Sequence, residues 1–372
     1  MALIKINTRS IPDDTVTPAK VSQNLGRRNL VINGAMNVAQ RGTSFSGTNG
    51  GDESQFVADR WRYGHKTGTV TITQNGVSDL VGFQNSVKIQ VTGTGTAATG
   101  NQDLFETKIE GQDLVSAGWG QTGAKDLTLS FYYKSNSTDN RVAWFYNPER
   151  GRDFAVIFAA SAVNTWERIT INIPADQAFD DSNGAGLYIR IVLSSGSQFT
   201  TGLASTWSAI GNDRYSGVAN FHSSTSNYAE FTGAQLEVGD TATPFEHRSY
   251  AEELTLCQRY FFTPAPRGFQ HGYIGPITSA SSSVAISLIT YPVAMRSAPS
   301  LEITNPSNDT YRYRSNNGSI NGNSNTNPVI GNTTKYNCRL DWTGFSGLTA
   351  NTSGCVTQGN GTNGYFGFTA EL

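Results

Sequence analysis

The chain has 372 residues, a formal net charge of −2, and charged side chains at only 15% of its positions. This length is sufficient for two domains. The near-neutral charge excludes a basic surface that holds nucleic acid by neutralising its phosphates. Aromatic residues make up 11% of the chain, which is too many for an unstructured polar chain. No apolar run approaches the length of a membrane span, so we expect no membrane insertion.

Residues 1–28 are predicted to form an extended arm. Pro12 and Pro18 oppose a helix there. A segment this short cannot bury a core of its own, so it needs a partner, either copies of itself or another protein. The alternative is a loose terminus. We predict virion docking or oligomerisation through the regularly placed apolar residues of this arm, which are Leu3, Ile4, Ile6, Ile11, Val16 and Val21.

Residues 29–248 carry the signals of an antiparallel β-sandwich. Polar and apolar residues alternate in many short segments, and Gly, Asn, Asp and Ser lie between them, as sandwich loops require. Clear examples are 69–74, 86–91, 166–174 and 187–193. An opening motif, Asn29–Met36, precedes the segment, and a closing motif, Gly233–Gly239, ends it. The pattern predicts a jelly-roll β-sandwich of about eight to ten strands.

Residues 249–262 break the alternation. Leu254, Cys257 and Phe261 have helical spacing, and Ser249 is a suitable N-cap. A short helical linker is therefore expected here. Residues 263–372 return to strand patterns and predict a smaller C-terminal β-sandwich. Its segment 305–337 is rich in Asn, Ser, Gly and Thr, which predicts exposed loops where binding residues often lie.

Catalytic and metal-binding patterns are not found in the sequence. The common nucleophile, nucleotide and metalloprotease motifs do not occur. The four histidines do not have the spacing of metal ligands. We therefore predict no enzymatic activity, no metal and no cofactor. Cys257, Cys338 and Cys355 are too few and too scattered for a disulfide framework, and reduced thiols of a protein made in a cytoplasm are expected.

Aromatic residues on loops are candidates for sugar contacts, because sugar rings stack on exposed aromatic faces. In the C-terminal domain rings and guanidinium groups alternate from Tyr311 to Arg314. A paired strand could carry this alternation for structural reasons alone. The candidate glycan contacts are Tyr311, Arg312, Tyr313, Arg314 and Trp342. Further loop candidates are Trp119, Trp207 and Tyr215, whereas Trp61, Trp144 and Trp166 lie in strand-like runs and are predicted to belong to the core or a sheet face.

Residues 1–262 resemble a known family. The opening motif with Gln40-Arg-Gly and Asp59-Arg-Trp, and the closing motif with Thr243-Pro-Phe-Glu and Cys257-Gln-Arg-Tyr, resemble the jelly-roll domains of bacteriophage tail-fibre and virion-fibre proteins, notably of the cyanophage type. The resemblance implies a structural, homotrimeric fibre subunit on the surface of a virion, assembled in the host cytoplasm. The arm would join other virion proteins, and the C-terminal domain would be a tip that attaches to a host surface polysaccharide or lipopolysaccharide. The alternative is a decoration or adaptor protein of the capsid or tail that stabilises the particle and reads no receptor.

The same jelly roll is similar to carbohydrate-binding modules of the galactose-binding-like type. In many of those an acidic group near the opening motif helps to hold a structural calcium ion. Here Ala35, Met36 and Asn37 occupy that place. Calcium prefers several oxygen ligands, and Ala35 and Met36 supply none from their side chains. Glu237 of the closing motif and backbone carbonyls stay open as ligands, but we expect no required metal.

Overall fold

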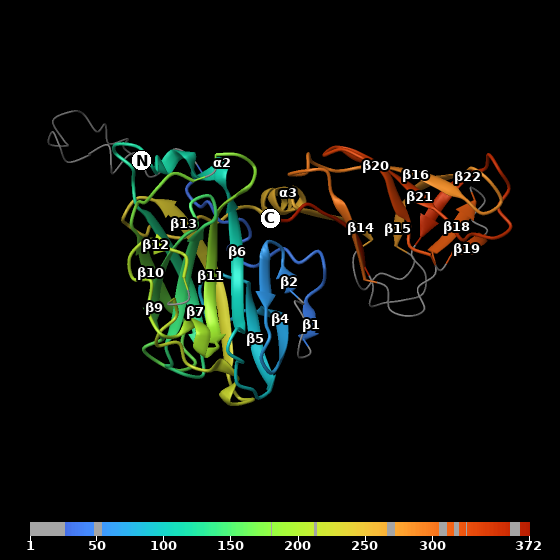
Figure 1. Cartoon of the computed structure of the whole chain (residues 1–372). Coiled ribbons are helices and arrows are strands. Elements are labelled where there is room, and N and C mark those ends of the chain that lie inside the picture. The colour runs from blue at the N-terminus through green and yellow to red at the C-terminus, as the bar shows by residue number, and fades with distance from the viewer. Residues whose placement is uncertain are drawn as a thin grey trace, which may run out of the picture.

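The computed structural model describes residues 27–47, 54–179, 181–211, 214–265, 272–304, 311–315, 320–324, 326–357 and 365–372. The strands form four antiparallel sheets, which confirms the all-β prediction (Figure 1). The arm residues Leu3, Ile4, Ile6, Ile11, Val16 and Val21 lie outside the described ranges, so their docking role stays a prediction. None of the helices in these ranges has the length and apolar character needed to cross a membrane.

The N-terminal unit is a sandwich of two antiparallel sheets. In spatial order, one sheet consists of β1 (Ser44–Gly47), β4 (Thr69–Gly76), β5 (Asn85–Gly93), β13 (Tyr228–Val238), β7 (Leu127–Ser135) and β10 (Glu167–Ile173). The other consists of β12 (Ser208–Ala209), β9 (Arg152–Phe158), β8 (Arg141–Asn147), β11 (Ala185–Ser195), β6 (Gln102–Glu110), β3 (Trp61–Gly64) and β2 (Ser54–Ala58).

The alternation in the strands decides which side chains fill this sandwich. Successive side chains point to opposite faces of a sheet. Ile189 and Ile191 of β11 therefore enter the core, while Tyr188 and Arg190 lie on the outer face. Phe105 of β6 stacks on Phe231 of the opposite sheet, with ring centroids 4.9 Å apart. Trp61 and Trp144 are buried as predicted, and Trp166 is half-buried.

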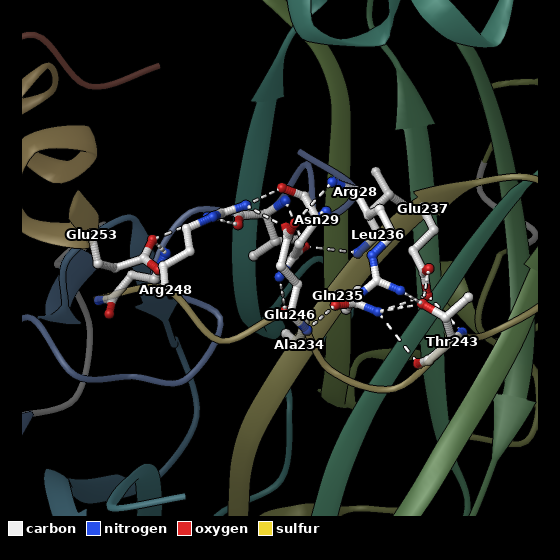
Figure 2. Close-up of polar contacts among 12 residues, drawn as sticks. Arg28, Asn29, Ala234, Gln235, Leu236, Glu237, Thr243, Glu246, Arg248 and Glu253 are labelled. Carbon is white, nitrogen blue, oxygen red and sulfur yellow. Dashed lines mark hydrogen bonds and ion pairs between the residues drawn. The ribbon is translucent and has the colours of Figure 1, made fainter. Parts of the chain in front are cut away.

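The opening and closing motifs lie side by side and close the sandwich (Figure 2). Asn29 is buried, its Nδ2 donates to Ala234 O at 3.0 Å, and its Oδ1 accepts from the backbone N–H groups of Val31 and Leu236. A Cβ atom at Gly34 would lie 2.0 Å from Ala234 O, so only glycine fits this close approach. The two motifs thus form one interlocked polar joint.

Replacement of Asn29 tests this joint. Asn29→Ala leaves buried backbone groups of β13 and of the opening motif without partners, and each such group costs about 1–3 kcal/mol. We expect the free energy of unfolding to fall by about 3 kcal/mol in a urea titration. Asn172→Ala, on the exposed face of β10, is the matched control and should change it by about 0.5 kcal/mol or less. Equal losses in both variants would argue against the joint.

A short helix and a second sandwich follow. Helix α3 (Tyr250–Gln258) begins at Ser249, whose hydroxyl accepts from Glu252 N–H, which confirms the predicted N-cap. One small sheet contains β14 (Phe261–Ala265), β23 (Tyr365–Thr369) and β17 (Ser300–Thr304). The larger sheet contains, in spatial order, β19 (Ile320–Ser324), β18 (Tyr311–Ser315), β22 (Ser353–Thr357), β15 (Tyr273–Ser279), β16 (Ala285–Thr290), β21 (Asn337–Trp342) and β20 (Val329–Thr333).

Buried ion pairs connect the two sandwiches. Arg41 follows the opening motif, and its side chain is only 2% exposed. Its Nε lies 2.7 Å from Glu302 Oε1 and its Nη1 3.4 Å from Glu371 Oε1, both in the C-terminal sandwich. The guanidinium carbon also lies 3.5 Å from the ring centroid of Phe261. Arg60 forms a second ion pair with Glu371. These contacts hold the C-terminal sandwich against the first one.

The segment from Arg259 to Phe261, at the end of α3, completes this interdomain joint. Glu110, at the end of β6, accepts from Arg259 at 2.8 Å and from the hydroxyl of Tyr260. Gln40 Nε2 donates to Phe261 O at 2.8 Å. The segments that follow the two motifs in the sequence therefore contain the residues that attach the second sandwich, which are Gln40, Arg41, Arg259 and Tyr260.

Asp59 makes the stability of the interdomain joint depend on pH. Burial raises the pKa of Asp59 from its ordinary value near 3.8 to about 6, although Arg41 and Gln40 act in the opposite direction. The folded chain therefore holds this proton more tightly than the unfolded chain, and stability is lost as the pH rises through that window. The difference between the two pKa values corresponds to about 3 kcal/mol. We expect urea unfolding of wild type and Asp59→Asn to differ increasingly from pH 4 to pH 6. A difference that is constant with pH would contradict this assignment.

Candidate functional site

The structure corrects the predicted aromatic glycan contacts of the C-terminal domain. Tyr311, Tyr313 and Trp342 have exposed fractions of 1%, 0% and 0%. Their rings pack inward against Phe366 and Phe345 in the core of the second sandwich. Because no ring face is accessible, these three residues cannot stack on a sugar. The alternation of Tyr and Arg arises from a paired strand with one buried face, which is the structural alternative.

Arg312 and Arg314 lie on the other face of β18. Both are half-buried, and they pair across the sheet with Thr357 and Cys355 of β22. The rings of Tyr311 and Tyr313 are buried on the opposite face. Arg312 and Arg314 therefore do not form the combined aromatic and cationic site that the sequence suggested. Their contact with a glycan stays a prediction.

Glu237, which stayed open as a calcium ligand, is surrounded by hydrogen-bond donors of the protein. Glu237 Oε1 accepts from Gln235 Nε2 at 2.8 Å and from Thr243 N at 3.0 Å, and Oε2 accepts from the Thr243 hydroxyl. Arg28 Nη1 lies 2.8 Å from Thr243 Oγ1, which brings a positive charge to the same place (Figure 2). Calcium needs an array of free oxygen ligands. Hydrogen-bond donors and a guanidinium group surround this carboxylate, so the residues do not fit a calcium ion.

The strongest candidate site lies on the outer face of the seven-stranded sheet of the first sandwich. We name this patch the aromatic–charged face. Tyr146 of β8 and Tyr188 of β11 are cross-strand partners, and their ring centroids lie 5.4 Å apart at an interplanar angle of 82°. Both rings are half-buried. The complete face consists of Arg62, Glu106, Lys108, Tyr146, Tyr188 and Arg190, on β3, β6, β8 and β11.

Charged side chains hold the rings in place. Lys108 pairs with Tyr188 across β6 and β11, and its Nζ lies 4.6 Å from the ring centroid. The guanidinium carbon of Arg190 lies 4.6 Å from the ring centroids of both Tyr188 and Trp144. Such cation–π contacts stabilise each pair by about 0.5–1 kcal/mol at partly exposed positions. The rings are therefore ordered before any ligand arrives.

A buried carboxylate organises the cations. Glu106 is almost completely buried and forms ion pairs with Arg62 and Arg190. Burial alone would raise the pKa of Glu106, but Arg190 and Arg62 hold it below its ordinary value. Glu106 is therefore ionised at neutral pH. Burial lowers the pKa of Lys108 to about 8, so this ammonium group is largely protonated at pH 7. Three cations and one carboxylate give the face a net positive charge.

This arrangement has the chemistry of a sugar-binding surface. The half-buried phenol groups contribute apolar surface and hydroxyls, and guanidinium and ammonium groups donate hydrogen bonds to the oxygens of a sugar. Sequence reasoning did not select these residues. A signal was present, because Tyr188 and Arg190 alternate with buried Ile189 in one strand, and Trp144 and Tyr146 alternate in another. The cross-strand register that brings the two strands together cannot be read from either strand alone.

The loop aromatics fall into two groups. Trp119 and Tyr215 are buried, which removes them as sugar contacts. Tyr215, in the segment between β11 and β13, packs edge-on against Trp144, with ring centroids 5.4 Å apart. Trp207 is half-buried, and its Nε1 donates to Pro174 O at 2.7 Å.

Comparison with known proteins gives no family assignment. No family model matches the chain, and no curated protein matches it. Solved structures give partial alignments. The enzymatically active domain of tailspike protein 4 of bacteriophage CBA120 aligns at 13% identity and a TM-score of 0.31, over 56% of this chain and 21% of that one. This chain thus spans about a fifth of the length of that tailspike domain.

Two carbohydrate-binding modules align over most of their own length. TmCBM61, solved with β-1,4-galactotriose, aligns at 7% identity and a TM-score of 0.28, over 57% of this chain and 99% of the module. The family 11 module of a cellulosomal cellulase of Clostridium thermocellum aligns at 13% identity and a TM-score of 0.25, over 55% and 89%.

Proposed function

We propose that the protein is a non-catalytic structural fibre subunit of a phage particle, and that it attaches to a host surface glycan through the aromatic–charged face. The ligand class is a polysaccharide or lipopolysaccharide that bears carboxylate or phosphate groups. Self-association into a homotrimer would place three such faces on one fibre and increase the avidity for a repetitive host surface.

One observation carries the glycan-binding part of this proposal. Tyr146 and Tyr188 form a cross-strand pair of half-buried rings, and charged side chains from three strands surround them. The excess of cations over carboxylates favours an anionic glycan, while the half-buried rings supply apolar contact that is independent of charge. Because part of the attraction is electrostatic, raising the salt concentration should weaken binding without abolishing it.

The biological role is tested on particles. Gold-labelled antibody against the chain locates it by electron microscopy, and the purified chain is added in excess before phage adsorption. We expect label on tail fibres and a reduced adsorption rate. Label on the capsid, together with an unchanged adsorption rate, would contradict the proposal and favour the decoration or adaptor role.

A further inference from the structure

A hollow lies at the end of the first sandwich where β6 leads to β7, and it has a volume of about 150 Å³. Helix α2 (Gly111–Leu114) and the turn η2 (Val115–Ala117) form one side of it. Trp119 and Phe179 line it, and their rings are stacked with centroids 4.2 Å apart. We name it the α2 hollow.

The α2 hollow has a mixed lining, in which Val115 and Phe179 offer apolar surface beside the polar side chains of Gln121 and Asp181. Trp119 has one ring face against Phe179, and its Nε1 donates to Lys125 O at 2.8 Å, so the indole is already engaged. Val115 is 61% exposed beside it, and Leu114 is buried. An aliphatic side chain in this hollow would remove the apolar surface of Val115 and Phe179 from water together with its own.

The described chain begins close to this hollow. Asp113 lies within α2, between the lining residues Gly111 and Leu114. Arg28 lies at this end of the sandwich, because its Nη1 is 2.8 Å from Thr243 Oγ1. Thr243 N–H in turn donates to Glu237, which pairs with Thr128 at the start of β7. The turn η2 lies at the same end, since Lys125 N–H donates to Ala117 O just before β7. In agreement with this, burial raises the pKa of Asp113 and the positive charge of Arg27 lowers it. Leu25 and Val21 precede Arg27 by two and six residues. An extended chain covers about 7 Å and about 20 Å over these lengths, so both side chains can reach the α2 hollow.

We propose that residues 21–25 of the same chain dock at the α2 hollow, with the side chain of Leu25 against Val115 and Phe179. The remainder of the arm then leaves the sandwich from a fixed point at this end. Its apolar residues, which are predicted to join other subunits or virion proteins, are thereby presented in one direction. This interaction does not depend on glycan binding by the aromatic–charged face.

A disulfide trap tests the contact directly. Leu25→Cys is combined with Val115→Cys in a chain whose half-buried Cys355 is replaced by Ser. The control combines Leu25→Cys with Val163→Cys, because Val163 is 48% exposed. Val163 lies at the opposite end of the sandwich. Its neighbour Asn164 donates to Ser135 O at the end of β7, whereas η2 lies just before Leu127 at the start of β7.

After mild oxidation we expect at least tenfold more intrachain disulfide when Leu25→Cys is combined with Val115→Cys than in the control, measured by peptide mass spectrometry. Equal yields in the two combinations would overturn the proposal. Mixed samples of isotope-labelled and unlabelled chain decide which copy supplies the segment. In an equal mixture, a fraction of labelled–unlabelled disulfides near one half, which random pairing between copies gives, would also overturn it, because a neighbouring copy would then fill the hollow.

Proteolysis tests the same contact without new thiols. Trypsin cleaves after Lys20, and docking of residues 21–25 should protect this bond. We expect cleavage at Lys20 to be at least fivefold faster in Val115→Asp than in wild type, because a carboxylate in the hollow expels the aliphatic side chain. Val163→Asp should leave the rate unchanged. Equal rates in wild type and both variants would overturn the proposal.

Discussion

Arg41→Ala is expected to lower the free energy of unfolding by about 3 kcal/mol, because it removes a buried guanidinium group from both of its carboxylate partners and from the ring of Phe261. Arg41 neutralises Glu302 and Glu371, and it also covers the ring of Phe261. Its removal leaves the carboxylate of Glu371, which is only 10% exposed, with Arg60 alone. Urea unfolding followed by tryptophan fluorescence measures the loss.

A matched control separates this interdomain joint from an ordinary ion pair. Arg339 forms a salt bridge with Asp341 at 2.7 Å, but its side chain is 44% exposed. Exposed pairs contribute about 0–1 kcal/mol, so Arg339→Ala should cost no more than that. Small-angle scattering provides the second readout, and Arg41→Ala should increase the radius of gyration as the sandwiches separate. Equal stability losses and an unchanged radius in both variants would contradict the role of Arg41.

Tyr188→Ala is expected to weaken binding of the host polysaccharide by about 10- to 100-fold. Truncation of a central aromatic contact commonly costs about 2 kcal/mol or more, and each 1.4 kcal/mol changes the dissociation constant about tenfold. The ring is also the common contact of Lys108 and Arg190, so its loss leaves both cations less ordered. Titration calorimetry with the purified polysaccharide measures the change.

The control for Tyr188→Ala is the same substitution at a tyrosine outside the aromatic–charged face. Tyr336 is 54% exposed in the C-terminal sandwich and lies outside the aromatic–charged face. Tyr336→Ala should leave the affinity within about twofold of wild type, which corresponds to about 0.4 kcal/mol. Thermal unfolding of both variants shows whether the fold is retained. A folded Tyr188→Ala chain with wild-type affinity would exclude this face as the binding site.

Much of the fold could be predicted from local patterns. Alternation placed Ile189 and Ile191 inside the first sandwich, and the N-cap at Ser249 marked the start of α3. These features depend on neighbours in the sequence. The interdomain joint could not be predicted in the same way, because Arg41 meets Glu302 across 261 positions and no local pattern identifies that partner.

The candidate site shows the same limit. Tyr311 and Tyr313 suggested an aromatic surface, but period-two alternation states only that two residues share a face, not which face is buried. Packing against Phe366 decided that question. Conversely, Tyr146 and Tyr188 gained their significance only from the pairing of β8 with β11. Surface chemistry on a sheet is assembled from strands, and the register determines it.

The most direct test of glycan attachment is a titration of the full chain with purified surface polysaccharide from its host at two salt concentrations. We predict saturable binding that weakens as the salt concentration rises and that is reduced by Tyr188→Ala. The absence of saturable binding at either salt concentration, or binding that Tyr188→Ala leaves unchanged, would contradict attachment through the aromatic–charged face.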